Sequence, residues 1–156
     1  MRHTVESSET SKKTIRDLAV TVTAYLKEMG LNTQPSEDGL FWFKYGSTVV
    51  MVRLFENEGH TFVRFLATLL TDVSFSPELL DRVLELNIEV LFGTFLVFKE
   101  DRTLAFAVTL LGDKLDFEEF EMALNYVARV SDDYDDPLQA VAGGKRAEDI
   151  LREEGV

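Results

Sequence analysis

Two arginines lie within apolar, β-favouring runs, and their chemistry could form a site. Arg53 belongs to the run Thr48 to Phe55 and Arg64 to the run Thr61 to Leu70, so both are expected in strands. Guanidinium groups are preferred partners of carboxylate and phosphate oxygens. Placed side by side, the two would form an anion or carboxylate site. The register between the strands is open at this point, and the alternative is a pair of solvated or ion-paired edge residues.

Asn87 is the third candidate ligand contact, because it lies in the middle of an apolar helical arc. Its amide could bind a ligand. A buried amide more often hydrogen-bonds a neighbouring backbone group, since leaving it unpaired costs about 1–3 kcal/mol. We favour this structural interpretation.

The remaining chemistry-bearing residues do not form a catalytic or metal-binding set. The chain has no cysteine, and two histidines, His3 and His60, are too few for a metal role. The carboxylates of Glu118 to Glu121 lie where they favour a helix dipole. The acidic run Asp132 to Asp136 lacks the glycine and distal glutamate of a calcium-binding loop. We therefore predict no enzyme activity, no cofactor and no metal.

Composition limits the class of protein. The 156 residues carry a net charge of −12, with 46% hydrophobic and 28% charged residues, as in one soluble globular domain. Such an acidic chain is a poor match for the nucleic-acid backbone. The apolar runs are shorter than the roughly 20 residues of a membrane-spanning helix, and residues 1–13 lack a signal-peptide core. We expect a cytoplasmic protein without nucleic-acid or membrane partners.

The first half of the chain reads as a helix followed by three strands. Apolar residues recur with helical period from about Ser11, and Gly30 ends the pattern. Gly46-Ser47 reads as a two-residue hairpin turn that places Lys44 opposite Val49. The more uniformly apolar face of this hairpin should then pack against the core. It consists of Phe41, Phe43, Tyr45, Val50, Val52 and Leu54.

The second half continues as a helix, a hairpin and another helix. Ser76 is a good N-cap and Pro77 suits the first helical position of a helix running to about Leu91. Strands follow at residues 94–99 and 103–111. Asp116 caps the next helix, which we expect to stop before Pro137. The predicted organisation is a flexible leader (1–10), one domain (11–136) and a flexible tail with a possible short helix (137–156).

The helix after Ser76 carries more apolar surface than a single sheet contact needs. The excess suggests a second contact, either deeper embedding or another subunit. The candidate interface residues come from this helix, from the mixed sheet face and from the last long helix: Leu79, Val83, Leu86, Val90, Trp42, Met51, Met122 and Tyr126.

The predicted fold is α+β, with the order α-β-β-β-α-β-β-α and an antiparallel meander sheet packed with helices. This order resembles the fold of bacterial type III secretion chaperones, and local motifs resemble their YbjN-like branch. The motifs are Ser76-Pro77-Glu78-Leu79-Leu80, Leu86-Asn87, Phe92-Gly93-Thr94-Phe95, Leu110-Leu111-Gly112-Asp113 with Leu115-Asp116, and Asp135-Asp136 followed by Leu138-Gln139 and Gly143-Gly144-Lys145-Arg146.

The resemblance implies a small bacterial, cytoplasmic, non-catalytic protein, often dimeric, that binds other polypeptides or acts as a regulator. Our leading hypothesis is a chaperone-like or regulatory protein-binding module, a homodimer holding a segment of a partner protein. The alternative is a sensory or regulatory domain in which Arg53, Arg64 or Asn87 binds a small anionic ligand.

Overall fold

The computed structural model describes residues 13–155, which form one mixed α+β fold. The elements, in chain order, are α1 (Ile15–Glu28), β1 (Leu40–Tyr45), β2 (Thr48–Asn57), β3 (His60–Thr71), α2 (Pro77–Glu89), β4 (Thr94–Phe98), β5 (Thr103–Leu111), α3 (Phe117–Ala142), β6 (Lys145–Arg146) and α4 (Ala147–Glu153). The predicted order and fold class are confirmed. The leader with His3, residues 1–10, lies outside the described residues.

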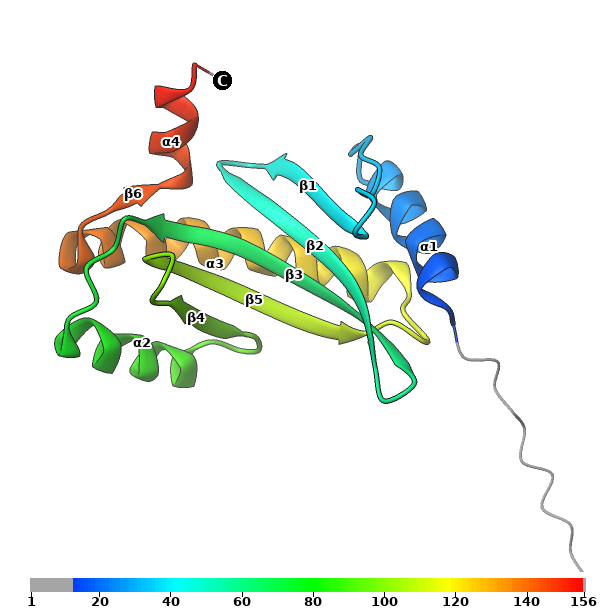
Figure 1. The fold of residues 1–156 in the computed structure, drawn as a ribbon, viewed down its shortest axis with the longest axis horizontal. Coiled ribbons are helices and arrows are strands. Elements are labelled where there is room, and N and C mark those ends of the chain that lie inside the picture. Colours follow the sequence, from blue (N-terminus) through cyan, green and yellow to red (C-terminus); the bar gives the residue numbers. More distant parts are fainter. Residues whose placement is uncertain (1–12, 156) are drawn as a thin grey trace, which may run out of the picture.

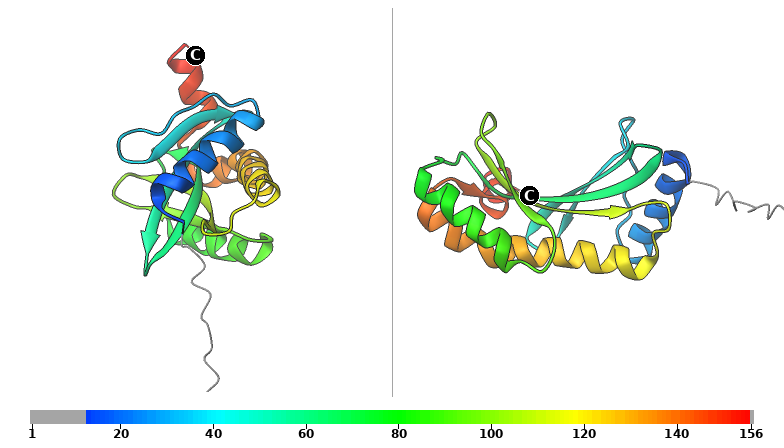
Figure 2. Two further views of the ribbon diagram at one scale, coloured as in Figure 1. Left: turned by 90° about the vertical axis from the view of Figure 1, so that its right-hand side faces the viewer. Right: turned by 90° about the horizontal axis from the view of Figure 1, so that it is seen from below.

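The strands form one antiparallel sheet with the order β1-β2-β3-β5-β4 (Figure 1). The short strand β6 pairs with the end of β3, where the pairing of β2 with β3 has already stopped at Ala67. Helices α1, α2 and α3 all lie on one side of this sheet, as the side view in Figure 2 shows. The molecule therefore has a helical layer and a sheet layer whose other face is not covered by these helices.

The core lies between the two layers. The predicted core face of the first hairpin is confirmed, because Phe41, Val50, Val52 and Leu54 are buried and Phe43 and Tyr45 pack against them. Phe65 and Phe106 continue this face in β3 and β5, and the Phe120 ring of α3 packs 5.0 Å from that of Phe65. Aromatic packing thus joins α3 to the middle of the sheet.

Local sequence signals explain where these elements begin. The side chains of Thr14, Ser76 and Asp116 each accept a hydrogen bond from the backbone N–H three residues on, which caps α1, α2 and α3. Lys44 pairs with Val49, as the Gly46-Ser47 turn predicts. The expected short helix near the C-terminus is present as α4.

Helix α3 continues through Pro137 to Ala142, which corrects the expected stop before the proline. Leu138 and Ala142 are buried, so the last turns are held by the core. The predicted domain boundary at residue 136 therefore falls inside a helix, and β6 adds the following residues to the sheet.

None of the helices in residues 13–155 is long and apolar enough to cross a membrane. The same part of the chain holds no group of three or more His, Cys, Asp or Glu side chains that could bind a metal ion.

Candidate functional site

The sheet face opposite the helical layer, called here the open face, is the most extensive candidate surface. One row of cross-strand neighbours on it runs from Trp42 through Met51, Leu66 and Ala107 to Thr94. Backbone pairing fixes this row, because alternate residues of a strand share a face. The row is therefore apolar in β1, β2, β3 and β5, with Met51 and Leu66 half-buried and Ala107 buried, and it ends at the hydroxyl-bearing Thr94 in β4.

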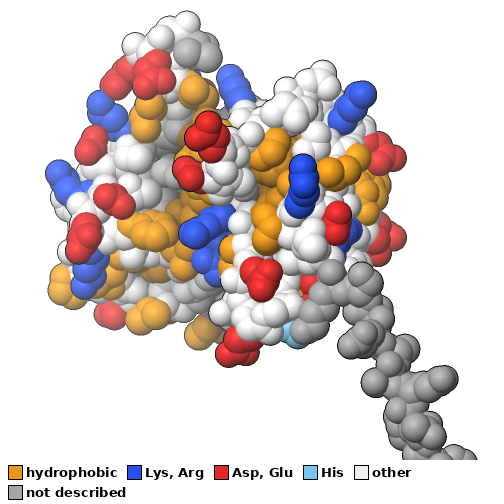
Figure 3. All heavy atoms as spheres, turned by 45° about the vertical axis from the view of Figure 1, so that its right-hand side comes forward, with side chains coloured by type: hydrophobic (Ala, Val, Ile, Leu, Met, Phe, Trp, Pro, Cys, Tyr) orange, Lys and Arg blue, Asp and Glu red, His pale blue; other side chains and the backbone are white. Residues whose placement is uncertain are grey.

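The exposure of its side chains makes the open face unusual for a sheet facing water. Trp42 of β1 is 56% exposed, and Phe98 at the end of β4 and Leu111 at the end of β5 are also exposed. Figure 3 shows hydrophobic side chains gathered in a hollowed part of the surface, with basic side chains among them. Contiguous apolar surface of this kind is typical of an interaction site.

Arg53 and Arg64 are direct cross-strand partners on the open face, so the structure brings this predicted pair together. The Phe55 ring lies beneath both guanidinium groups, with centroid distances of 6.0 Å to Arg53 and 5.3 Å to Arg64. Phe62 stacks on Phe55 at 5.4 Å. Arg64 Nε also donates to Thr109 Oγ1 at 2.9 Å. The Arg64 guanidinium is thus held by two contacts, whereas the exposed Arg53 guanidinium contacts the same ring.

A hollow of about 400 Å³ opens beside Arg64 where β4 begins. Phe92, Leu96 and Ala107 give it apolar walls, and Thr94 and Thr109 supply hydroxyl groups. Gly93, which lines the hollow, lets the chain approach β5 closely just before β4, because its φ of +89° favours glycine and an added Cβ would meet Ala107 O at 2.7 Å. Residue composition alone did not indicate this hollow, although the Phe92-Gly93-Thr94-Phe95 motif marks its location.

Asn87 lies away from the arginine pair. Its Oδ1 accepts hydrogen bonds from Phe95 N at 2.6 Å and from Thr94 Oγ1 at 3.3 Å. The amide oxygen therefore joins α2 to the start of β4, as the structural interpretation predicted. Because its amide oxygen already accepts these two hydrogen bonds, we do not include Asn87 with Arg53 and Arg64 in the candidate anion site.

The candidate interface residues of α2 need a correction. Leu79, Val83 and Leu86 are buried in the core of the chain itself, so they do not lie on an exposed surface. The excess apolar residues lie elsewhere on the helix and just beyond it. Leu84 is 66% exposed, Ile88 86% and Leu91 83%, and we call these three the helix stripe.

The other candidate interface residues divide between surface and core. Met122 is exposed on α3, Val90 is half-buried, and Trp42 and Met51 lie on the open face. Tyr126 is mostly buried, because Phe92 stacks on its ring at 4.5 Å and its hydroxyl accepts a hydrogen bond from Leu91 N at 2.8 Å. This residue therefore positions the end of α2.

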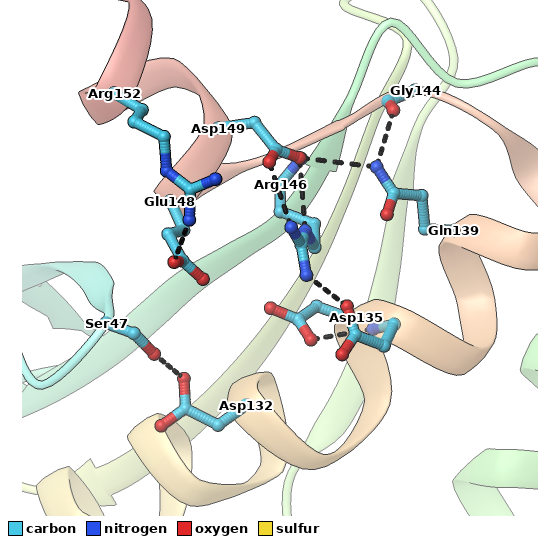
Figure 4. Close-up of polar contacts among 10 residues, drawn as sticks. Ser47, Asp132, Asp135, Gln139, Gly144, Arg146, Glu148, Asp149 and Arg152 are labelled. Carbon is cyan, nitrogen blue, oxygen red and sulfur yellow. Dashed lines mark hydrogen bonds and ion pairs between the residues drawn. The ribbon is translucent and has the colours of Figure 1, made fainter.

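A polar cluster holds the C-terminal elements against α3 (Figure 4). Arg146 donates from Nε and Nη2 to the two carboxylate oxygens of Asp149, at 3.1 and 2.9 Å, and also pairs with Asp136 of α3. Gln139 Nε2 donates to Gly144 O at 3.0 Å. We call Asp136, Gln139, Arg146 and Asp149 the C-terminal lock. The Asp-Asp…Gly-Gly-Lys-Arg motif thus has a structural role that sequence analysis did not identify.

The electrostatics of the lock follow from these contacts. The hydrogen bonds from Arg146 hold the pKa of Asp149 well below its usual range, and those with Asp149 and Asp136 raise the pKa of Arg146. Burial raises the pKa of neighbouring Asp135. The lock is therefore an internal ion pair network rather than a charge offered to a ligand.

A second hollow, of about 660 Å³, lies between α2 and the end of α3. Its floor includes Leu86, Tyr134 and Leu138, and its rim is mainly acidic, with Arg82 as a basic member. Arg82 is already paired with Glu85 and Glu89 at 3.3 and 3.4 Å. The hollow is thus a second potential contact surface on the helical layer.

Comparison with known proteins places this arrangement in a family. Residues 16–150 match the family model described as "T3SS (YopN, CesT) and YbjN peptide-binding chaperone 1", or TY-Chap1. The chain belongs to the TY-Chap1 family. A search of curated proteins finds no match to this TY-Chap1 chain.

Solved structures share the TY-Chap1 fold at low sequence identity. The ExsC-ExsE complex matches with a TM-score of 0.64 and 17% identity over 78% of this chain and 96% of the other. The HopA1-SchA chaperone-effector complex gives 0.61 and 6% over 79% and 98%. The Yersinia pestis type III secretion chaperone SycH, in complex with a stable fragment of YscM2, gives 0.57 and 12% over 74% and 98%. At these identities, the likeness shows the shared fold.

Proposed function

We propose that this chain is a non-catalytic chaperone that holds an extended segment of a partner protein on its open face. The observation that carries the proposal is the row of the open face that runs from Trp42 to Thr94 and is apolar in four of its five strands. Membership of a peptide-binding chaperone family and similarity to chaperones solved with partner proteins support it.

The open face suits an extended segment better than a compact small ligand. Its apolar side chains follow each other across the strands, and alternate residues of an extended segment point to one side. The segment could therefore insert every second side chain between Met51, Leu66 and Leu96. Removal of this apolar surface from water would provide the main driving force.

We also propose a cytoplasmic homodimer that associates through the helix stripe of Leu84, Ile88 and Leu91. Met122 belongs to the same region, because it lies one helical turn from Tyr126, whose hydroxyl bonds Leu91 N. A two-fold dimer formed here would cover the exposed leucine and isoleucine side chains on both copies. It would leave both open faces available for partners.

Site-specific photo-crosslinking in the native cells tests the site of partner binding. A benzoylphenylalanine residue placed at Trp42 or Phe98 should give crosslinks to a partner polypeptide. The same residue at Val20, which is exposed on α1 in the helical layer, is the matched control and should give few. Equal crosslinking from all three positions, or none from the open face, would contradict the proposal.

Binding of a small anion by Arg53 and Arg64 is the second candidate function. The pairing of these residues across two strands and the hollow beside Arg64 favour it. A thermal shift induced by a small dicarboxylate such as glutarate, and lost in the Arg53→Gln/Arg64→Gln variant, would support this function.

A further inference from the structure

The arginine pair on the open face lacks a counter-charge in the described chain. Arg53 and Arg64 are opposite each other in the antiparallel register. Like charges in this position repel each other. No carboxylate of residues 13–155 forms an ion pair with either side chain. This is notable in a chain with 28 acidic and 16 basic residues.

The surroundings of the pair contact both guanidinium groups without neutralising their charge. The Phe55 ring supports both guanidinium groups, and Thr109 accepts one hydrogen bond from Arg64. The remaining N–H donors of the two planar groups are free to form parallel hydrogen bonds with a carboxylate. Because Arg64 is already positioned by the ring and by Thr109, its share of such binding would cost little conformational entropy.

The hollow beside Arg64 adds an apolar subsite to this charged one. Its walls are mainly carbon, from Phe92, Leu96 and Ala107, and Arg64 lies at its border. A ligand that filled both places would carry a carboxylate and an apolar group a short distance apart. Neighbouring side chains of a polypeptide meet this requirement.

We infer that the open face selects partner segments with an aspartate or glutamate seated between Arg53 and Arg64 and an apolar side chain in the hollow beside Arg64. This inference rests on the proposed function and specifies the chemistry of the partner. The net charge of −12 disfavours acidic partners in general. Selection would therefore depend on the position of one acidic residue rather than on the total charge of the segment.

An array of synthetic peptides can test this selection with the full-length chain. Each 13-residue peptide carries apolar residues at alternate positions and occurs in three forms, with Glu, Gln or Lys at the centre. The wild-type chain should bind the Glu forms about tenfold more tightly than the Gln forms, since hydrogen bonds between a guanidinium and a carboxylate are stronger than those to a neutral amide. The Lys forms should bind most weakly.

Three variants separate the arginine pair from general charge. Arg53→Gln/Arg64→Gln should bind the Glu and Gln forms equally, and Arg53→Glu/Arg64→Glu should prefer the Lys forms. Lys27→Gln/Lys114→Gln removes the same charge from exposed positions outside the open face and should keep the Glu preference. Circular dichroism establishes that each variant is folded.

The outcomes distinguish this inference from the proposed function. Binding of peptides without a Glu preference, or a preference that survives in Arg53→Gln/Arg64→Gln, would overturn the inference and leave peptide binding in place. Failure to bind any form would overturn both. A response to free glutarate alone, without a peptide preference, would assign the pair to a small anion and also overturn the inference.

Discussion

Among the single residues, Asn87 has the clearest structural role outside the open face. Its Oδ1 accepts the 2.6 Å hydrogen bond from Phe95 N, which fixes the start of β4 against α2. Asn87→Ala should lower the free energy of unfolding by about 1–3 kcal/mol, because the Phe95 N–H loses its partner in a partly buried place. Asn87→Asp keeps the acceptor oxygen and should cost less. Urea unfolding measures both, and equal stability of wild type and Asn87→Ala would contradict this role.

Asp113 gives the chain a predictable response to acid. Hydrogen bonds from Thr61 N and Oγ1, at 3.0 and 2.7 Å, and the contact with His60 Nδ1 lower the pKa of Asp113 to about 2. Because the folded pKa is below the unfolded one, its stabilising contribution is complete above about pH 4 and is lost as the pH falls toward 2.

The Asp113→Asn variant tests this pH dependence. It should be less stable than wild type at neutral pH, and the difference should shrink between about pH 4 and pH 2. Urea midpoints across this range provide the measurement. Asp38→Asn, at an exposed position before β1, is the control. A difference between wild type and Asp113→Asn that stayed constant down to pH 2 would show that Asp113 does not act through its charge.

At the level of elements, the C-terminal lock attaches β6 and α4 to the rest of the fold. The helix α4 has only seven residues and would not be stable alone. Arg146→Ala removes the bonds to Asp136 and Asp149 together. It should increase the amide hydrogen exchange of residues 145–153 by about tenfold or more, while β3 and β5 keep their protection.

An exposed ion pair in α4 provides the control for this variant. Arg152 pairs with Glu148 at the surface, where such pairs contribute little. Arg152→Ala should leave the exchange of α4 nearly unchanged. Similar exchange in Arg146→Ala and wild type would mean that the pairing of β6 with β3 holds these elements without the lock.

The register of the β1–β2 hairpin could be predicted from the sequence, whereas the register of the β2–β3 hairpin could not. Gly46-Ser47 marks the turn between β1 and β2 directly. The stretch Glu56 to His60 between β2 and β3 is compatible with several turn positions. The structure uses Glu58-Gly59, both with positive φ, as a two-residue turn. Once this turn is known, simple counting places Arg53 opposite Arg64. The correct position of this one turn would therefore have been enough to predict the arginine pair.

The end of α3 shows where tertiary packing overrides a local signal. A proline inside a helix removes one hydrogen bond and clashes with the preceding turn, at a cost of about 3 kcal/mol or more. Pro137 is tolerated because Leu138 and Ala142 are buried and Gln139 binds Gly144 beyond the helix. These contacts depend on the tertiary structure, so they cannot be recognised from the sequence near Pro137.

For the molecule as a whole, the surfaces proposed for partner binding and for dimerisation lie in different layers. The open face carries an apolar row with two basic side chains, whereas the helix stripe on α2 is apolar and lies in the helical layer (Figure 2). The predicted excess of apolar surface on the helix after Ser76 is therefore real, but it involves Leu84 and Ile88 rather than the buried Leu79 and Val83. We therefore expect that single substitutions can disrupt the proposed dimer and the proposed peptide binding independently.

Substitution of Ile88, at the centre of the helix stripe, tests the proposed dimer. This side chain is 86% exposed in the single chain, so Ile88→Asp should leave the fold intact but place a charge in the dimer interface. Light scattering at micromolar concentration should give a dimer for wild type and a monomer for Ile88→Asp. Val20→Asp, exposed on α1, should remain a dimer. A monomeric wild type, or a dimeric Ile88→Asp, would exclude this interface. The expected preference of the open face for Glu peptides should be the same in all three proteins, because the arginine pair lies in the other layer.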